Sequence, residues 1–165
     1  MSKPGVVMER AKLARRLQDT KQRVVLANGC FDLLHVGHLR YLTAAKACGD
    51  VLVVAINTDA SVARIKGPTR PLVPFVERAE LVAALSPVDF VVPFDEPTLE
   101  ATLRELVPAV HTKGTDYTVD NVPEAPVDRE LGIEIEICGD PKDHDSSELA
   151  RRLGAPPSDS SSPPA

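Results

Sequence analysis

The chain has 165 residues, the length of one ordinary domain, and its 43% hydrophobic residues can form a core without disulfides or a structural metal. Its net charge of −5 provides no global basic field for a nucleic acid, and it contains neither a signal peptide nor an apolar run near the roughly 18 residues of a membrane span. A cytoplasmic protein without membrane or nucleic-acid partners is therefore expected.

The first segment is predicted to be a surface helix. Met8, Leu13 and Leu17 lie near one face of a helix over residues 8–20, with lysines and arginines opposite. Residues 1–22 are therefore expected to be an N-terminal helix packed on the domain that follows.

Strands and helices alternate from residue 23 to residue 153. Five apolar runs predict strands, at 23–27, 50–56, 88–92, from 109 and at 133–137. Helices are predicted from residue 39, from residue 74, over 97–106 and over 146–153. In the last strand Glu134 and Glu136 alternate with isoleucines, which indicates a half-exposed strand at a sheet edge.

This alternation predicts an α/β fold, a Rossmann-like parallel five-stranded sheet with helices on both faces and right-handed crossovers. Residues 23–153 would form this domain. Residues 154–165 contain no apolar residue larger than Ala or Pro and are expected to be a disordered tail. The dinucleotide-binding motif G-x-G-x-x-G and the P-loop motif G-x-x-x-x-G-K-[ST] are both absent from the sequence. The sequence therefore does not favour a dehydrogenase or a P-loop kinase.

The three cysteines are expected to be reduced thiols. Cys30, Cys48 and Cys138 are far apart in the sequence and have no metal-type spacing. The sequence therefore predicts neither a disulfide nor a metal site at these residues.

The segment after the first strand, residues 28–38 (NGCFDLLHVGH), is the strongest candidate site. Asn28 and Gly29 could form a hairpin turn, but a hairpin needs a second strand, and the sequence from Leu39 has a helical period. Ligands of parallel sheets bind beyond the carboxyl ends of the strands, which is where this segment lies.

His35 and His38 flank the first turn of the predicted helix and would point to the same side, because they are three residues apart. Gly37 between them leaves the backbone open to close approach by a ligand. A helix N-terminus binds phosphate well, and two imidazoles there can donate hydrogen bonds to phosphate oxygens as charge builds in a transition state.

Residues 29–38 resemble the signature of the cytidylyltransferase-like nucleotidyltransferases, in which His35 and His38 match an HxGH pair. The resemblance covers about residues 23–153 and implies a fold of the HxGH nucleotidyltransferase type. The blocks at 66–71 (KGPTRP) and 113–117 (KGTDY) are most similar to D-glycero-β-D-manno-heptose 1-phosphate adenylyltransferases, which make ADP-heptose for the lipopolysaccharide core.

The resemblance implies catalytic roles for His35, His38 and Lys66, with Lys66 neutralising the phosphates where pyrophosphate leaves. It implies nucleotide or phosphate contacts by a wider set of residues, namely Gly29, Cys30, Phe31, Gly37, Arg70, Lys113, Gly114, Asp116, Ser146 and Ser147. Lys66 and Arg70 are expected in a shaped loop, and Ser146 and Ser147 at a helix start where serine commonly caps. Arg78 is a weaker candidate, because in a helix beside Glu77 and Glu80 it could simply be a surface ion-pair partner.

The implied reaction is an in-line attack by a sugar 1-phosphate on the α-phosphorus of ATP, with Mg²⁺ as cofactor and no protein metal ligands assigned. One alternative is an enzyme like a glycerol 3-phosphate cytidylyltransferase. Another is a nucleotide-sensing module without turnover, which Asp145 favours because it places an acid beside the phosphate site. The oligomeric state stays open, with a homodimer as one candidate.

Overall fold

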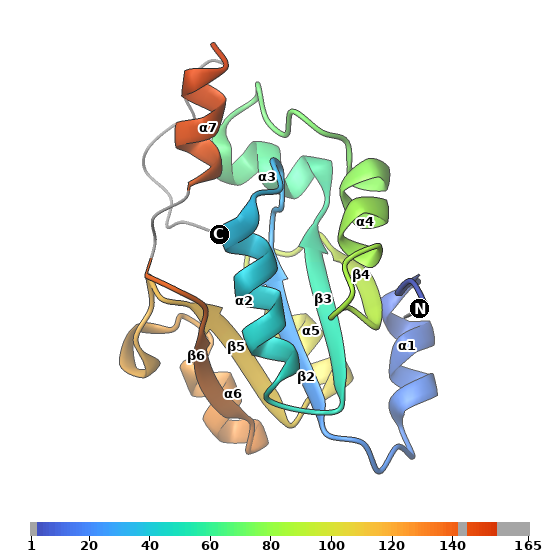
Figure 1. The fold of residues 1–165 in the computed structure, drawn as a ribbon. Helices are drawn as coiled ribbons and strands as arrows, with labels where there is room; N and C mark the ends of the chain where they lie inside the picture. Colours follow the sequence, from blue (N-terminus) through green and yellow to red (C-terminus); the bar gives the residue numbers. More distant parts are fainter. Residues whose placement is uncertain (1–2, 142–144, 155–165) are drawn as a thin grey trace.

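The computed structural model describes residues 3–141 and 145–154, and its centre is a six-stranded parallel sheet (Figure 1). The strands are β1 (Val6–Val7), β2 (Val24–Gly29), β3 (Val51–Asn57), β4 (Phe90–Phe94), β5 (Val110–Gly114) and β6 (Glu134–Cys138). Their order across the sheet is β1-β4-β3-β2-β5-β6, and each neighbouring pair is parallel.

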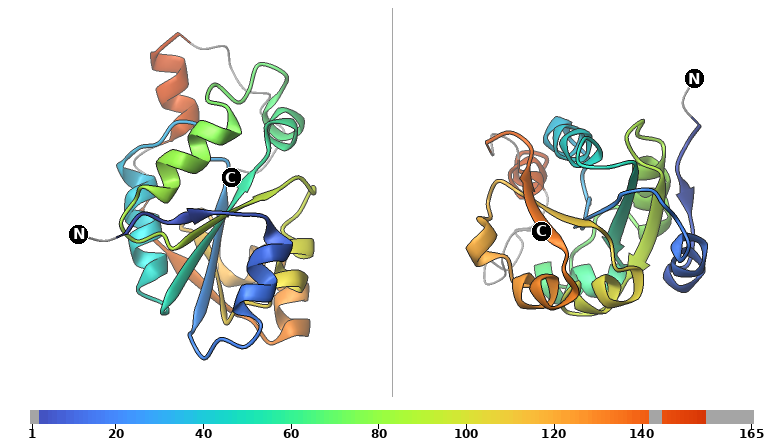
Figure 2. Two further views of the ribbon diagram at one scale, coloured as in Figure 1. Left: turned by 90° about the vertical axis from the view of Figure 1, so that its right-hand side faces the viewer. Right: turned by 90° about the horizontal axis from the view of Figure 1, so that it is seen from below.

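Helices lie on both faces of this sheet (Figure 2). One face packs against α2 (Val36–Lys46) and α4 (Phe75–Ala83). The other packs against α1 (Arg10–Leu17), α5 (Glu100–Leu106) and α6 (Ala125–Leu131). Beyond the carboxyl ends of the strands lie α3 (Asp59–Lys66) and α7 (Ser146–Arg152), and a short 3-10 helix, η1 (Val119–Asn121), precedes α6 (Figure 1).

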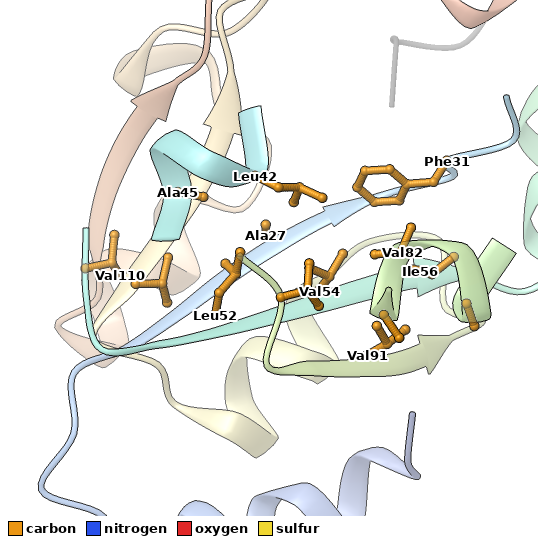
Figure 3. Packing of buried hydrophobic residues seen from close by; sticks show 14 residues of the cluster. Ala27, Phe31, Leu42, Ala45, Leu52, Val54, Ile56, Val82, Val91 and Val110 are labelled. Atoms are coloured by element: carbon orange, nitrogen blue, oxygen red, sulfur yellow. The ribbon is translucent and has the colours of Figure 1, made fainter. Parts of the chain in front are cut away.

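The alternating side chains of the central strand build both halves of the core. In β3, Leu52, Val54 and Ile56 point to the α2 and α4 face, as Figure 3 shows, whereas the residues between them point to the α1 and α5 face. All seven residues of β3 are buried. A continuous apolar run is the expected sequence of such a strand, because parallel strands are covered on both faces.

The predicted fold class is confirmed, but the predicted number of strands is wrong. The sixth strand, β1, has two residues, too few for any sequence pattern, and joins the sheet through Val6 N–H, which donates to Asp89 O. The strand at 133–137 is confirmed as an edge strand, since β6 has β5 as its sole neighbour in the sheet of the described residues.

Two short helices were missed in the sequence. The residues of α3 show no clear apolar stripe, and the helix is defined locally by the Thr58 side chain, which accepts a hydrogen bond from Ser61 N–H. The seven residues of α6 include Pro126 in the first turn. Residues 155–165 of the expected tail lie outside the described residues. No helix in the described part of the chain combines the length and apolar character that a membrane span requires.

Two leucines provide a matched test of this core. Leu52 is fully buried in β3, whereas Leu81 on α4 is 52% exposed. Leu52→Ala is expected to lower the free energy of unfolding by about 3 kcal/mol, because it removes buried methyl groups and leaves a cavity. Leu81→Ala should change it by less than about 0.5 kcal/mol. Urea unfolding followed by circular dichroism measures both, and equal effects would contradict the assigned position of β3.

Candidate active site

The strand order reverses between β2 and β5. From β2 the chain continues to β3 on one side, whereas β5 pairs with β2 on the other side. Ligands of open α/β sheets bind outside the carboxyl ends of the strands at such a point. Here Lys113 at the end of β5 donates from Nζ to Asn28 Oδ1 at the end of β2 over 3.1 Å, so a cation bridges this edge.

Lys113 is held by an acid from a neighbouring segment. Its Nζ lies 3.3 Å from Glu124 Oε2 and 5.4 Å from the centroid of the Tyr117 ring. Burial acts to raise the pKa of Glu124, but the charge of Lys113, the neighbouring His111 and the hydrogen bond from Leu99 N–H together outweigh burial, and the pKa of Glu124 is lowered. Lys113 and Gly114 are the last residues of β5, rather than part of a turn after it. At Gly114 an added Cβ would meet just Asp116 Oδ1, at 4.0 Å, so the strand end leaves room beside it.

The two histidines cap the helix that starts above this edge. His35 is the N-cap of α2, and its Nδ1 accepts a hydrogen bond from Gly37 N–H over 3.2 Å. His38 Nδ1 accepts from His35 N–H over 3.4 Å, and the two rings stack with centroids 3.9 Å apart. The side chains therefore lie together, as their spacing predicts. Because each Nδ1 accepts, the neutral ring carries its proton on Nε2, where it is a donor.

The loop before the histidines has a constrained backbone. Phe31 has a φ of 51°, in the left-handed region that bulky residues rarely adopt, and its side chain is buried. The Phe31 ring lies 5.1 Å from that of His38, and a Cβ at Gly29 would be 3.0 Å from the Phe31 ring. Gly29 and Phe31 thus shape the loop beneath the histidine pair.

Arg70 is buried in an ion pair. Arg70 Nε lies 2.6 Å from Asp32 Oδ2, and neither side chain is exposed. The other carboxylate oxygen of Asp32 accepts from the N–H groups of Leu72 and Val73 at 2.8 and 3.0 Å. Both terminal nitrogens of Arg70 are buried without a hydrogen-bond partner among the described residues. Asp32 therefore fixes the course of the segment from Arg70 to Val73.

Arg78 is fully buried, so its interpretation as a surface residue is wrong, although its Nη2 does form an ion pair with the half-exposed Asp59 over 2.6 Å. Its Nη1 donates to Cys30 O and Asn57 O at 2.6 and 2.9 Å, and its Nε donates to Val73 O at 2.8 Å. It thereby ties the ends of β2 and β3 to the same loop. Its spacing from the apolar residues Phe75 and Val82 places it on the buried face of α4, which was the sequence signal for this role.

Lys66 ends helix α3, so its predicted place in a loop is wrong, whereas Arg70 does lie in the loop that follows. Burial raises the pKa of the Cys30 thiol, and the positive charges of Lys66, Arg78 and Arg70 act in the opposite direction. These three cations therefore gather near the end of β2. A local positive cluster of this kind is what an anionic ligand requires in a chain of net charge −5.

Helix α7 is joined to the histidine loop by a serine. Ser146 Oγ donates to Leu33 O over 3.0 Å. The N-cap is Asp145, whose carboxylate accepts from Ser147 N–H over 2.7 Å, so neither predicted serine is the cap. Aspartate is favoured at the N-cap position because its carboxylate accepts a hydrogen bond from a free N–H group and is stabilised by the helix dipole.

Neutralising Asp32 tests the importance of the buried ion pair. Asp32→Asn is expected to lower the free energy of unfolding by about 3 kcal/mol, because it leaves the Arg70 charge buried without a counter-charge. Glu130→Gln is the matched control, since its pair with Arg104 is exposed, and no measurable change is expected there. Urea unfolding of both variants gives the comparison, and equal stability of the two would refute the role of Asp32.

Residues 26–151 match the family described as cytidylyltransferase-like. The bifunctional protein HldE of Geobacter sulfurreducens is 50% identical over 116 residues, which cover 70% of this chain and 24% of that protein. HldE of Alcanivorax borkumensis is 39% identical over 150 residues, covering 89% of this chain and 32% of that protein. The chain thus spans less than a third of the length of these relatives.

Two solved structures have the same fold. A lipopolysaccharide core biosynthesis protein from Thermoplasma volcanium superposes with a TM-score of 0.57 at 33% identity, over 70% of this chain and 93% of that one. A pantoate-beta-alanine ligase from Francisella tularensis gives a TM-score of 0.61 at 17% identity, over 87% of this chain and 69% of that one, and supports the fold alone. Because the family match spans the histidine pair, the Lys113 edge and most of α7, the chain belongs to the cytidylyltransferase-like family.

Proposed function

We propose that this chain transfers AMP from ATP to D-glycero-β-D-manno-heptose 1-phosphate, releasing pyrophosphate and forming ADP-heptose. The observation that carries the proposal is the stacked pair of His35 and His38 at the N-terminus of α2, beside the point where the strand order reverses. The heptose substrate rests on the resemblance of residues 66–71 and 113–117 to heptose 1-phosphate adenylyltransferases. The similarity to HldE over 70% of this chain supports the same assignment.

The reaction needs no covalent intermediate with the protein. An oxygen of the sugar 1-phosphate attacks the α-phosphorus of ATP in line with the leaving pyrophosphate, so positioning and charge stabilisation supply the catalysis. The Nε2–H groups of His35 and His38 donate hydrogen bonds to phosphate oxygens. The first N–H groups of α2 add further donors and the positive end of the helix dipole. Lys66 neutralises the pyrophosphate as it leaves. Cys30 takes no chemical step, in keeping with a buried thiol whose pKa is raised.

The residues present are compatible with Mg²⁺ that arrives with the nucleotide. Among residues 3–141 and 145–154 no group of three or more His, Cys, Asp or Glu side chains could hold a metal ion. Mg²⁺ is commonly bound by substrate phosphates with few protein ligands, so the oxygens of ATP would be its main ligands. When bound, it would neutralise charge on the phosphates.

Asp145 is the acid on which the nucleotide-sensing alternative depends. Its carboxylate is engaged by Ser147 N–H of its own helix and stabilises the start of α7. This local role accounts for the presence of an acid near the phosphate site without requiring a loss of catalysis. The catalytic proposal is therefore preferred.

Replacing either histidine with alanine tests the catalytic step. If His35 and His38 stabilise charge that grows in the transition state, each variant should lose about 10²–10³-fold in kcat, with a much smaller change in nucleotide affinity. Steady-state pyrophosphate release and nucleotide titration measure the two quantities. His38→Gln retains a donor, so partial activity would indicate hydrogen bonding, and complete loss would indicate a charged imidazolium.

Thr43→Ala on the exposed side of α2 is the control, and it should retain the parent kcat and melting temperature. A lower melting temperature with unchanged turnover per folded molecule in the histidine variants would indicate a purely structural capping role. Near-parent turnover in both would remove the basis of the proposal.

The choice of nucleotide separates the proposed enzyme from its alternatives. Mg-ATP should raise the melting temperature more than Mg-CTP at equal concentration, since a ligand at 100 times its Kd adds about 2.7 kcal/mol. MgCl₂ alone is the blank. A larger shift with CTP, and pyrophosphate release with glycerol 3-phosphate rather than heptose 1-phosphate, would favour the cytidylyltransferase alternative. An ATP shift without pyrophosphate release in the presence of heptose 1-phosphate would favour a sensor.

A further inference from the structure

Two of the three cysteines meet in the folded chain. Cys48 Sγ and Cys138 Sγ lie 3.8 Å apart although the residues are 90 positions apart in the sequence. Cys48 follows the C-cap of α2, and Cys138 is the last residue of β6. All three thiols are free in the structure, and the wide separation of Cys48 and Cys138 in the sequence gave no sign of this contact.

The two sulfurs are close enough to be joined by a small movement. A disulfide has an S–S distance of about 2.05 Å, so the sulfurs would have to approach by less than about 2 Å. Cys48 is in a turn outside the regular part of α2, and Cys138 ends an edge strand that pairs with β5 alone among the described strands.

The two thiols have different surroundings. Cys138 is 7% exposed, whereas Cys48 is partly exposed, so an oxidant in solution meets Cys48 first. Burial, together with the neighbouring Cys48, raises the pKa of Cys138. Cys30 lies in a different environment, where its Sγ donates to Asn57 Oδ1 over 3.5 Å. Cys48 is thus the more accessible thiol of the pair, and Cys30 serves as an internal control.

We propose that Cys48 and Cys138 form an oxidisable dithiol that takes low-molecular-weight disulfides such as oxidised glutathione. The Cys48 thiolate attacks one sulfur of the small disulfide, whose S–S bond breaks and releases one small thiol. Cys138, as thiolate, then attacks the Cys48 sulfur of the mixed disulfide and releases the second small thiol. The protein loses two electrons and two protons, and the small disulfide gains them as two thiols.

The cross-link would reinforce a contact that the fold already makes. Gly139, directly after Cys138, lies so close to α2 that an added Cβ would be 3.3 Å from Tyr41 Cα. Tyr41 Oη also donates to Thr112 O in β5, the strand beside β6, over 2.8 Å. A bond between Cys48 and Cys138 therefore joins segments that are already neighbours, and it closes a long loop in the unfolded chain.

The test exposes the 165-residue chain to oxidised glutathione and counts free thiols, with intact mass and peptide mapping. We expect two of the three thiols to disappear, the mass to fall by two hydrogen atoms, and a peptide pair joining Cys48 to Cys138. The melting temperature should rise by about 5–10 °C and return to its starting value with dithiothreitol. Three free thiols after prolonged incubation, or a lower melting temperature in the cross-linked protein, would overturn the proposal.

Single variants distinguish this pair from other thiol reactions. Cys30→Ser should still form the intrachain disulfide, because Cys30 takes no part in it. Cys48→Ser and Cys138→Ser should form none, although a mixed disulfide with glutathione is expected at Cys48 when Cys138 is replaced. A cross-link between two chains, or one that includes Cys30, would also overturn the proposal. None of these measurements depends on the proposed nucleotidyl transfer.

Discussion

A carboxylate without access to solvent must be neutralised and hydrogen-bonded, and Asp32 meets both needs through Arg70 and the N–H groups of residues 72 and 73. Arg78 completes the arrangement by donating to the backbone where β2 and β3 end. Together they hold the segment from Arg70 to Val73 against the loop that leads to the histidines. The geometry of the site therefore depends on charges that never touch solvent, and the rest of the edge is built on them.

The same edge concentrates positive charge in an acidic protein. Lys66, Arg70 and Arg78 influence the Cys30 thiol, while Lys113 bridges β2 and β5 on the other side of the strand end. Three of these four cations are paired with carboxylates, Arg70 with Asp32, Arg78 with Asp59 and Lys113 with Glu124, so the net positive charge at the edge is smaller than a count of cations suggests. Under the proposed function, the α2 N-terminus and the donors on its two histidines would supply much of the remaining attraction for phosphate.

Helix α2 couples the two ends of this arrangement. Its first turn is organised by His35 and His38 themselves, which serve as caps and as candidate phosphate donors at once. Its last turn leads to Cys48, in contact with Cys138 of β6. Between them Tyr41 bonds to Thr112 in β5, and burial raises the pKa of this tyrosine, so it remains a donor. One helix thus connects the candidate chemistry to the sheet edge where the dithiol lies.

The sequence by itself determined the parallel α/β class, the buried central strand and the position of the histidine pair, because these follow from local periodicity and from a three-residue spacing. It missed β1, which has two residues and exists through pairing with β4, and it missed α3, whose start depends on one capping side chain. The helical spacing of Arg78 and the aspartate at the start of α7 were local signals that were missed, whereas only the tertiary structure decided that Arg70 pairs with Asp32 and that Cys48 meets Cys138. The reason is that these ion pairs and sulfur contacts join residues from elements that are far apart in the chain. No local sequence pattern predicts which of these elements will pack together.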